Sequence, residues 1–302
     1  MKHKNRTGLT FSIMLVLAMA VLLPLRHASG ADLSDIRKQG VLRHLGIVYA
    51  NFVTGSGDGL DVEMMKRFAE HLGVKYQFVE TTWAGAVGDL TGKKVIPRGD
   101  EIEITGSLPV KGDVVATGFT VLKWREKIVD FSTPTFPTQI WLVTQTDSSL
   151  CPIKPSGTID ADIAAVKQQL KGKSVLGMAD TCLDPNLYGM KEAGASMVNF
   201  TMTMNALVPA VINSDADTTI LEVPDALTAL QKWPGKIKII GPLSPLQYMA
   251  CAFDKNSPEL RDEFNRFFEK CKKDGTYLGL IKKYYPLVLD YYPEFFQVSD
   301  SK

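Results

Sequence analysis

GDVVATGFTVLKWREKIVDFSTP, residues 112–134, is the stretch on which the interpretation of this chain rests. A short apolar run, Val114–Ala116, predicts a buried strand, and Gly118, Thr120 and Arg125 follow it. The loop would present a backbone amide, a hydroxyl and a guanidinium together. Because a planar guanidinium donates two parallel hydrogen bonds to a carboxylate, this combination is typical of a carboxylate site. The alternative is a surface arginine beside a core strand.

The same stretch resembles the signature of the family 3 extracellular solute-binding proteins, which are the periplasmic receptors of amino-acid ABC importers. Their pattern is roughly G-M-T-I-T-P-E-R-x-K-x-V-D-F-S, and residues 118–132 read GFTVLKWREKIVDFS. Leu122-Lys123-Trp124 replaces the usual Thr-Pro-Glu. The resemblance implies that Gly118, Thr120 and Arg125 hold the α-carboxylate of a bound amino acid.

Composition sets the broad class of the protein. The chain has 302 residues, of which 45% are hydrophobic and 22% charged, which is enough for two globular lobes. Removing the four basic residues of the first thirty positions takes the formal net charge from +1 to −3. This balance excludes the basic footprint of a nucleic-acid-binding protein.

The first thirty residues are typical of a secretory signal peptide. Lys2, Lys4 and Arg6 form a basic start, the run 9–25 is almost wholly apolar, and Ala28-Ser29-Gly30 offers a cleavage site before Ala31. The alternative is an uncleaved membrane anchor, for which the run is short. No cysteine follows the run, so no lipoprotein attachment site is expected. We expect a soluble, exported protein in the periplasm.

The four cysteines, Cys151, Cys182, Cys251 and Cys271, all follow this segment. In an oxidising compartment they allow one or two disulfides, with three complete pairings possible. Their spacings match no zinc pattern, and only two histidines follow the signal segment. We expect neither a metal site, nor a cofactor, nor a catalytic histidine.

Two further blocks of the first half resemble the family. Tyr49 falls where the family carries the aromatic residue that covers the ligand, and GLDVEMMKRFAEHLGV, residues 59–74, matches its amphipathic-helix block. Trp83 falls on a position near the pocket and is expected as a ligand wall. Core packing is the alternative for both aromatic residues.

The second half carries two degenerate blocks. GMADTCLDPN, residues 177–186, stands where the family has a turn whose amides meet the ligand carboxylate, which makes Thr181 and Cys182 the matching positions. The Asp180 carboxylate would repel an anionic ligand there, unless it caps the helix. Cys182 has no visible base, so a disulfide with Cys151 is favoured over a nucleophilic role.

Glu222 is the expected partner of the ligand's ammonium group. It lies in NSDADTTILEVPDALTAL, residues 213–230, at the position of a family aspartate that binds the α-ammonium. The alternative is a glutamate that caps the following helix. The ending KKDGTYLGLIKKYYP, residues 272–286, resembles the family's closing block. The role of the aromatic tail 287–302 cannot be interpreted.

Strands that alternate with helices predict an α/β fold, and the resemblance implies the two-lobed, type 2 periplasmic-binding architecture with two hinge crossings. We expect a signal peptide at 1–30, lobe 1 at 31–143, lobe 2 at 144–246, and a return to lobe 1 with a tail at 247–302. Residues 92–111 depart from the family and predict a two-stranded insertion.

The leading hypothesis is a monomeric periplasmic substrate-binding protein that passes an amino acid or a similar zwitterion to an ABC permease. It would not be an enzyme. One alternative is an enzyme of the cyclohexadienyl dehydratase type, with Glu222 as a general acid. Another is a receptor subunit for a membrane sensor. The identity of the ligand is not readable from the sequence.

Overall fold

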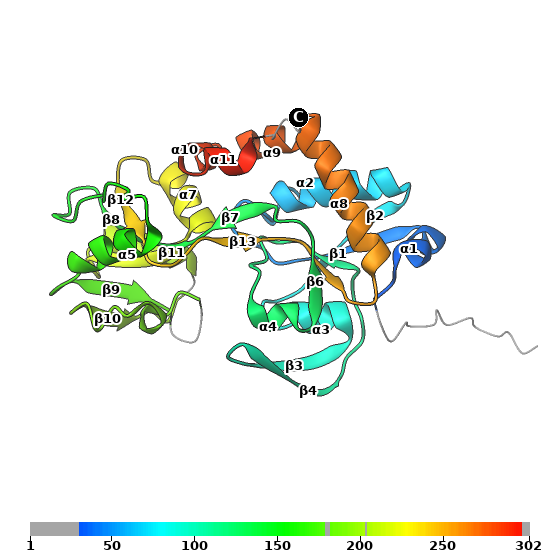
Figure 1. The fold of residues 1–302 in the computed structure, drawn as a ribbon, viewed down its shortest axis with the longest axis horizontal. Helices are drawn as coiled ribbons and strands as arrows, with labels where there is room; N and C mark the ends of the chain where they lie inside the picture. The colour runs from blue at the N-terminus through cyan, green and yellow to red at the C-terminus, as the bar shows by residue number, and fades with distance from the viewer. Residues whose placement is uncertain (1–29, 179–181, 203, 298–302) are drawn as a thin grey trace, which may run out of the picture.

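The computed structural model of the protein describes residues 30–178, 182–202 and 204–297. These residues form two lobes side by side, each built on a five-stranded sheet flanked by helices (Figure 1). The predicted two-lobed α/β fold is therefore confirmed. The expected signal peptide lies almost wholly outside the described residues. Within the described part of the chain, no helix combines the length and the apolar composition that crossing a bilayer requires.

The sheet of lobe 1 has the strand order β2-β1-β5-β14-β6. Strand β1 pairs in parallel with β2 and β5, while β14 returns from the far end of the chain and pairs antiparallel with β5 and β6. The strands are β1 (Val41–Gly46), β2 (Lys75–Glu80), β5 (Val114–Val115), β6 (Val129–Phe131) and β14 (Ala252–Asp254). The chain therefore needs both of its ends to complete this lobe.

Helices cover the sheet of lobe 1. They are α1 (Leu33–Gln39), α2 (Leu60–Leu72), α3 (Ala86–Thr91), α4 (Lys123–Glu126), α8 (Pro258–Lys273) and α9 (Thr276–Tyr284). The predicted helix 60–72 is confirmed: its stripe of Met65, Phe68 and Leu72 is buried, and Gly73 ends it in the left-handed conformation. This burial of one apolar face anchors α2 to the sheet.

The start of α8 is capped by a residue from the other end of the chain. Ser257 stands at the cap position, but its hydroxyl donates to the carbonyl of Ala31. The Asp32 carboxylate instead accepts from the N–H of Leu260 and also caps α1. One N-terminal aspartate thus satisfies backbone donors of two helices.

The sheet of lobe 2 has the order β10-β9-β11-β8-β12. Its strands are β8 (Ile140–Gln145), β9 (Ser174–Gly177), β10 (Ser196–Asn199), β11 (Thr218–Glu222) and β12 (Ile237–Pro242). Its helices are α5 (Ile159–Gln168), α6 (Leu207–Ile212) and α7 (Val223–Lys232), with 3-10 turns η1 (Pro185–Tyr188) and η2 (Met204–Ala206). Residues 140–143, assigned to lobe 1 by sequence, already pair in this second sheet.

The two lobes are joined by a pair of antiparallel strands, β7 (Phe136–Thr138) and β13 (Gln247–Met249). Figure 1 shows both strands running between the lobes. Two adjacent crossings allow the lobes to rotate about them, as in a hinge.

The predicted two-stranded insertion is confirmed as a hairpin, β3 (Lys93–Arg98) and β4 (Glu101–Ser107). It lies under lobe 1 in Figure 1 and contacts α4 through two ion pairs, Lys123–Asp100 at 3.3 Å and Lys127–Glu101. Exposed ion pairs of this kind contribute little to stability.

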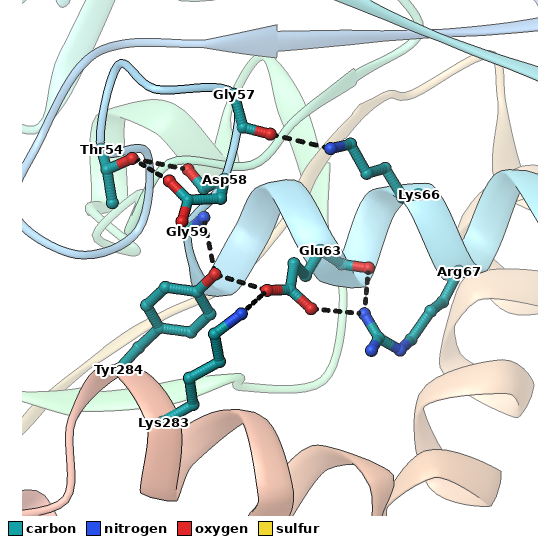
Figure 2. A network of polar contacts seen from close by, with 9 residues as sticks. All are labelled: Thr54, Gly57, Asp58, Gly59, Glu63, Lys66, Arg67, Lys283 and Tyr284. Carbon is teal, nitrogen blue, oxygen red and sulfur yellow. Dashed lines mark hydrogen bonds and ion pairs between the residues drawn. The ribbon is translucent and has the colours of Figure 1, made fainter.

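Helix α9 is attached to α2 by a polar network around Glu63 (Figure 2). The Glu63 carboxylate accepts from Lys283, from the Tyr284 hydroxyl and from Arg67. Partial burial alone would raise the pKa of Glu63, but these donors outweigh it and lower the pKa to about 2. The C-terminal helix is thereby held against the first lobe.

The C-terminal segment continues as α10 (Val288–Tyr291) and α11 (Pro293–Phe296) and lies over the hinge strands. Tyr292 stacks on Trp141 of β8, with ring centroids 6.0 Å apart, and its hydroxyl donates to Gln139 at 2.7 Å. Phe296 contacts Phe136 of β7. This segment therefore touches the hinge and the edge of lobe 2.

Tyr292→Ala should destabilise the protein by about 1–3 kcal/mol, because it removes both a half-buried ring and a hydrogen bond. Tyr292→Phe, which loses only the hydrogen bond, should cost about 1 kcal/mol. Urea unfolding of the two variants beside the wild type measures both values. Equal midpoints for all three proteins would contradict this account of the segment.

Candidate functional site

Arg125 lies at the inner side of lobe 1, on the short helix α4. Its Nη1 donates to the carbonyl of Thr120 at 2.7 Å, and its guanidinium stands 3.8 Å from the ring centroid of Phe119. Burial lowers the pKa of Arg125 to about 10, so the group stays positively charged at neutral pH. The ring supports the guanidinium from one face by a cation–π contact.

The buried Nε of Arg125 has no hydrogen-bond partner among the described residues. A buried guanidinium N–H without an acceptor costs about 1–3 kcal/mol or more. Such a group fits a site that receives an acceptor from outside the chain. A carboxylate, which accepts two parallel hydrogen bonds, has the matching shape.

Gly118 has a different role from the expected one. Its N–H donates to Asp61 of α2 at 2.7 Å, so this amide is not available to a ligand. Its φ of +61° is left-handed, and an added Cβ would lie 2.4 Å from the ring of Phe52. The glycine is required by packing and backbone conformation, not by ligand contact.

Tyr49 and Trp83, the two residues expected to form an aromatic wall, lie in contact. Tyr49 stacks on the buried Phe52, with centroids 6.0 Å apart, and meets Trp83 edge to face at 5.2 Å. Trp83 in turn stacks on Phe119 and keeps 39% of its surface exposed. Tyr49 is therefore buried between the lobes, while the Trp83 side chain stays partly exposed.

Glu222 ends β11 of lobe 2 and contacts two residues of lobe 1. Its carboxyl accepts from the Tyr49 hydroxyl at 3.0 Å and from the Thr120 hydroxyl at 3.2 Å. It stands at the cap position of α7 but makes no capping hydrogen bond. Burial raises the pKa of Glu222, against the opposing effect of Arg125. The structure thus brings Tyr49, Thr120, Arg125 and Glu222 together.

Two aspartates at the site were not predicted as functional. Asp225, on the first turn of α7, lies at hydrogen-bond distance from the Tyr49 hydroxyl, with 2.9 Å between the Asp225 Oδ2 and the Tyr49 oxygen. Burial and the nearby Glu222 raise the pKa of Asp225 to about 8. The spacing between Glu222 and Asp225 could have identified Asp225 from the sequence, because residues three apart at the start of a helix share one face. Asp61 is the second aspartate, and it was missed because it lies in the block 59–74, which was interpreted only as an amphipathic helix.

The turn before Cys182 is only partly described. Thr181 lies outside the described residues. Cys182 lies close enough to Arg125 and Glu222 to interact electrostatically with both. All four cysteines are free, so the expected disulfide between Cys151 and Cys182 is not formed. In the described residues, no cluster of His, Cys, Asp or Glu is placed to hold a metal ion.

Comparison with known proteins places the chain in a family. Residues 104–286 match the model of the bacterial extracellular solute-binding proteins, family 3, which is more than half of the chain. The chain belongs to this family.

Among curated proteins, the chain is similar to a membrane-bound lytic murein transglycosylase F of Desulfosudis oleivorans. The two are 26% identical over 76% of this chain, but the chain covers only 44% of that protein's length. A probable histidine-binding protein of Campylobacter jejuni is 23% identical, and the match covers 75% of this chain and 76% of that protein. An L-cystine-binding protein of Escherichia coli is 24% identical, and the match covers 91% of this chain and 94% of that protein.

Solved structures share the fold of this chain. An ancestral amino-acid-binding protein described as a precursor of cyclohexadienyl dehydratase is 26% identical, with a TM-score of 0.61. The match covers 84% of this chain and 99% of that one. A mutant of ArgBP from T. maritima has the same TM-score at 24% identity, over 84% and 99% of the two chains.

The buried Asp61 should make stability depend on pH. Burial raises its pKa from 3.8 to about 7, although the hydrogen bond from Gly118 opposes this shift. The folded state therefore holds a proton that the unfolded chain loses, and stability should fall as pH rises from about 4 to about 7. Thermal melting across this range should show a smaller fall for Asp61→Asn than for the wild type. An unchanged slope in the variant would contradict the assignment.

Proposed function

We propose that the chain is the periplasmic substrate-binding protein of an ABC importer, capturing an amino acid or a similar small carboxylate-bearing solute between its lobes. The observation that carries the proposal is the buried Arg125, whose Nε lacks an acceptor among the described residues. A ligand carboxylate would fill this position, with help from the Thr120 hydroxyl.

The opposite charge comes from the second lobe. Glu222 would take the ammonium group of the ligand, and Tyr49 and Trp83 would cover its apolar part. Because Glu222 contacts Tyr49 and Thr120 directly, these contacts have to separate before a ligand can enter. Lobe closure over the ligand would then exclude water, which strengthens the charge pairs.

The comparisons support this proposal through the names of the relatives. Proteins named for binding histidine and L-cystine match over three quarters or more of this chain. Membership of an extracellular solute-binding family agrees with a periplasmic location and with a membrane permease as partner. The activity in the name of the transglycosylase relative is not carried over, because this chain spans less than half of that protein.

One observation favours a second function, an enzyme of the cyclohexadienyl dehydratase type. Glu222 is a buried carboxyl with a raised pKa, which is the property of a general acid. A solved relative is described as a precursor of that enzyme. A dianionic substrate such as prephenate would need more cationic groups than Arg125 alone supplies. Turnover of prephenate or arogenate by the purified protein would establish this second function.

Arg125→Ala should abolish or strongly weaken amino-acid binding. Removing one partner of a buried charge pair costs about 2–5 kcal/mol, or roughly 30- to 5000-fold in affinity. A thermal-shift screen against amino acids, polyamines and organic acids identifies the ligand, because binding raises the melting temperature. Calorimetric titration of the wild type and of Arg125→Ala with that ligand gives the ratio of their dissociation constants.

Arg98→Ala is the matched control, because Arg98 is an exposed arginine of the β3–β4 hairpin that pairs with Glu103. It should bind the ligand as the wild type does. If Arg125→Ala retains wild-type affinity, the proposed carboxylate site is wrong.

A further inference from the structure

The carboxyls of Glu222 and Asp225 meet at a single tyrosine hydroxyl. Glu222 ends β11 and Asp225 follows within the first turn of α7, so both side chains leave the same end of lobe 2. The Tyr49 oxygen lies 3.0 Å from Glu222 Oε2 and 2.9 Å from Asp225 Oδ2. Both separations are hydrogen-bond distances between oxygens.

Counting hydrogens shows what this arrangement requires. A tyrosine hydroxyl carries one hydrogen, and an ionised carboxylate carries none. Two hydrogen bonds among these three oxygens therefore need one further proton, and it has to reside on a carboxyl. The Tyr49 hydroxyl itself keeps its hydrogen, because burial and the two acids raise the pKa of Tyr49.

Among the described residues, no cation forms an ion pair with either acid. Arg125 lies near enough to Glu222 to oppose the rise of its pKa, but its Nη1 donates to the Thr120 carbonyl. The remaining groups that face the acids are the Thr120 hydroxyl and the Cys182 thiol, with the Tyr285 hydroxyl near Tyr49 and Asp225. These groups supply polar contacts but no second positive charge.

We propose that Glu222 and Asp225 form one cation subsite that holds a proton, and that the ammonium group of the ligand replaces this proton. The inference rests on the proposed function and adds Asp225 to the residues that bind the ligand. An ammonium group has three N–H donors, enough for both carboxylates and one hydroxyl oxygen. The displaced proton passes to the solvent, so charge and atoms balance.

A single glutamate would not need this exchange. One carboxylate and one ammonium compensate each other, whereas two carboxylates exceed one ammonium by one negative charge. The second carboxyl therefore gives up its proton only where the N–H donors of the ammonium replace the hydrogen bond that this proton made. The raised pKa of Asp225, about 8, keeps the proton in place at neutral pH until a cation arrives. Ligand affinity should then rise with pH, by up to about tenfold per unit below that pKa.

The test is calorimetric titration at pH 7 in phosphate and in Tris, two buffers with different heats of ionisation. The probe is whichever proteinogenic L-amino acid or L-cystine gives the largest thermal shift. The wild type should release about one proton per ligand bound, seen as a difference in observed heat between the buffers. Asp225→Asn should still bind but release less than about half as much, and its affinity should vary little between pH 6 and 8.

Asp147→Asn is the control, because Asp147 is an exposed aspartate far along the chain from this pair. It should release as many protons as the wild type. Binding by the wild type without proton release, or equal release by Asp225→Asn, overturns this inference alone. Failure of every amino acid to bind overturns the proposed function as well.

If Asp225→Asn does not fold, the pH profile of wild-type affinity decides: a flat profile between pH 6 and 8 is evidence against the subsite.

Discussion

The close contact between Gly118 and the ring of Phe52 is the constraint on which the site depends. The ring occupies the space that any Cβ at position 118 would need, and the left-handed backbone there would cost a non-glycine residue about 1–2 kcal/mol more. Asp61 fixes the same peptide from the other side. Tyr49 stacks on Phe52, so the position of the aromatic wall follows from this one contact. Thr120, two residues further on, is placed by it too.

The cleft is unusual in its balance of charge. One guanidinium, supported by an aromatic ring, stands on lobe 1. Two carboxyls of lobe 2 meet the Tyr49 hydroxyl, and one of them, Glu222, also interacts electrostatically with Arg125. A neutral hydroxyl, that of Tyr49, separates the acids from each other. The Arg125 Nε has no acceptor among the described residues, and the proposed zwitterionic ligand would supply one.

Much of the fold was predictable because it depends on local patterns. The apolar stripe of α2, its closing Gly73 and the alternation in 101–105 each specify an element through nearest neighbours, and the structure has those elements. The arrangement of the residues in the proposed carboxylate site was predictable only in part. Arg125 and Thr120 stand together as expected, whereas the Gly118 amide is taken by Asp61, a partner 57 residues away. Spacing alone cannot show which long-range acceptor competes for a donor.

The same limit explains the other differences. Asp225 was missed because its significance comes from Tyr49, which is 176 positions earlier in the chain. The start of α8 shows the same effect: Asp32, from the opposite end of the chain, accepts from Leu260, while the adjacent Ser257 makes no capping hydrogen bond. Residues 140–143 were expected in lobe 1 but pair in the sheet of lobe 2, because strand pairing and not composition decides where a sheet begins. In each case a contact between distant segments overrides a correct local preference.

The aromatic segment at the C-terminus gives the hinge a mechanical property of its own. Its rings rest on Phe136 of one crossing and on Tyr248 of the other, while Tyr292 is bonded to Gln139 at the edge of lobe 2. Rotation of the lobes about these strands has to slide or separate those rings. The stiffness of the joint is therefore set at a surface remote from the charged cleft. Sequence changes in this segment would alter the resistance of the joint to rotation without changing any residue of the candidate site.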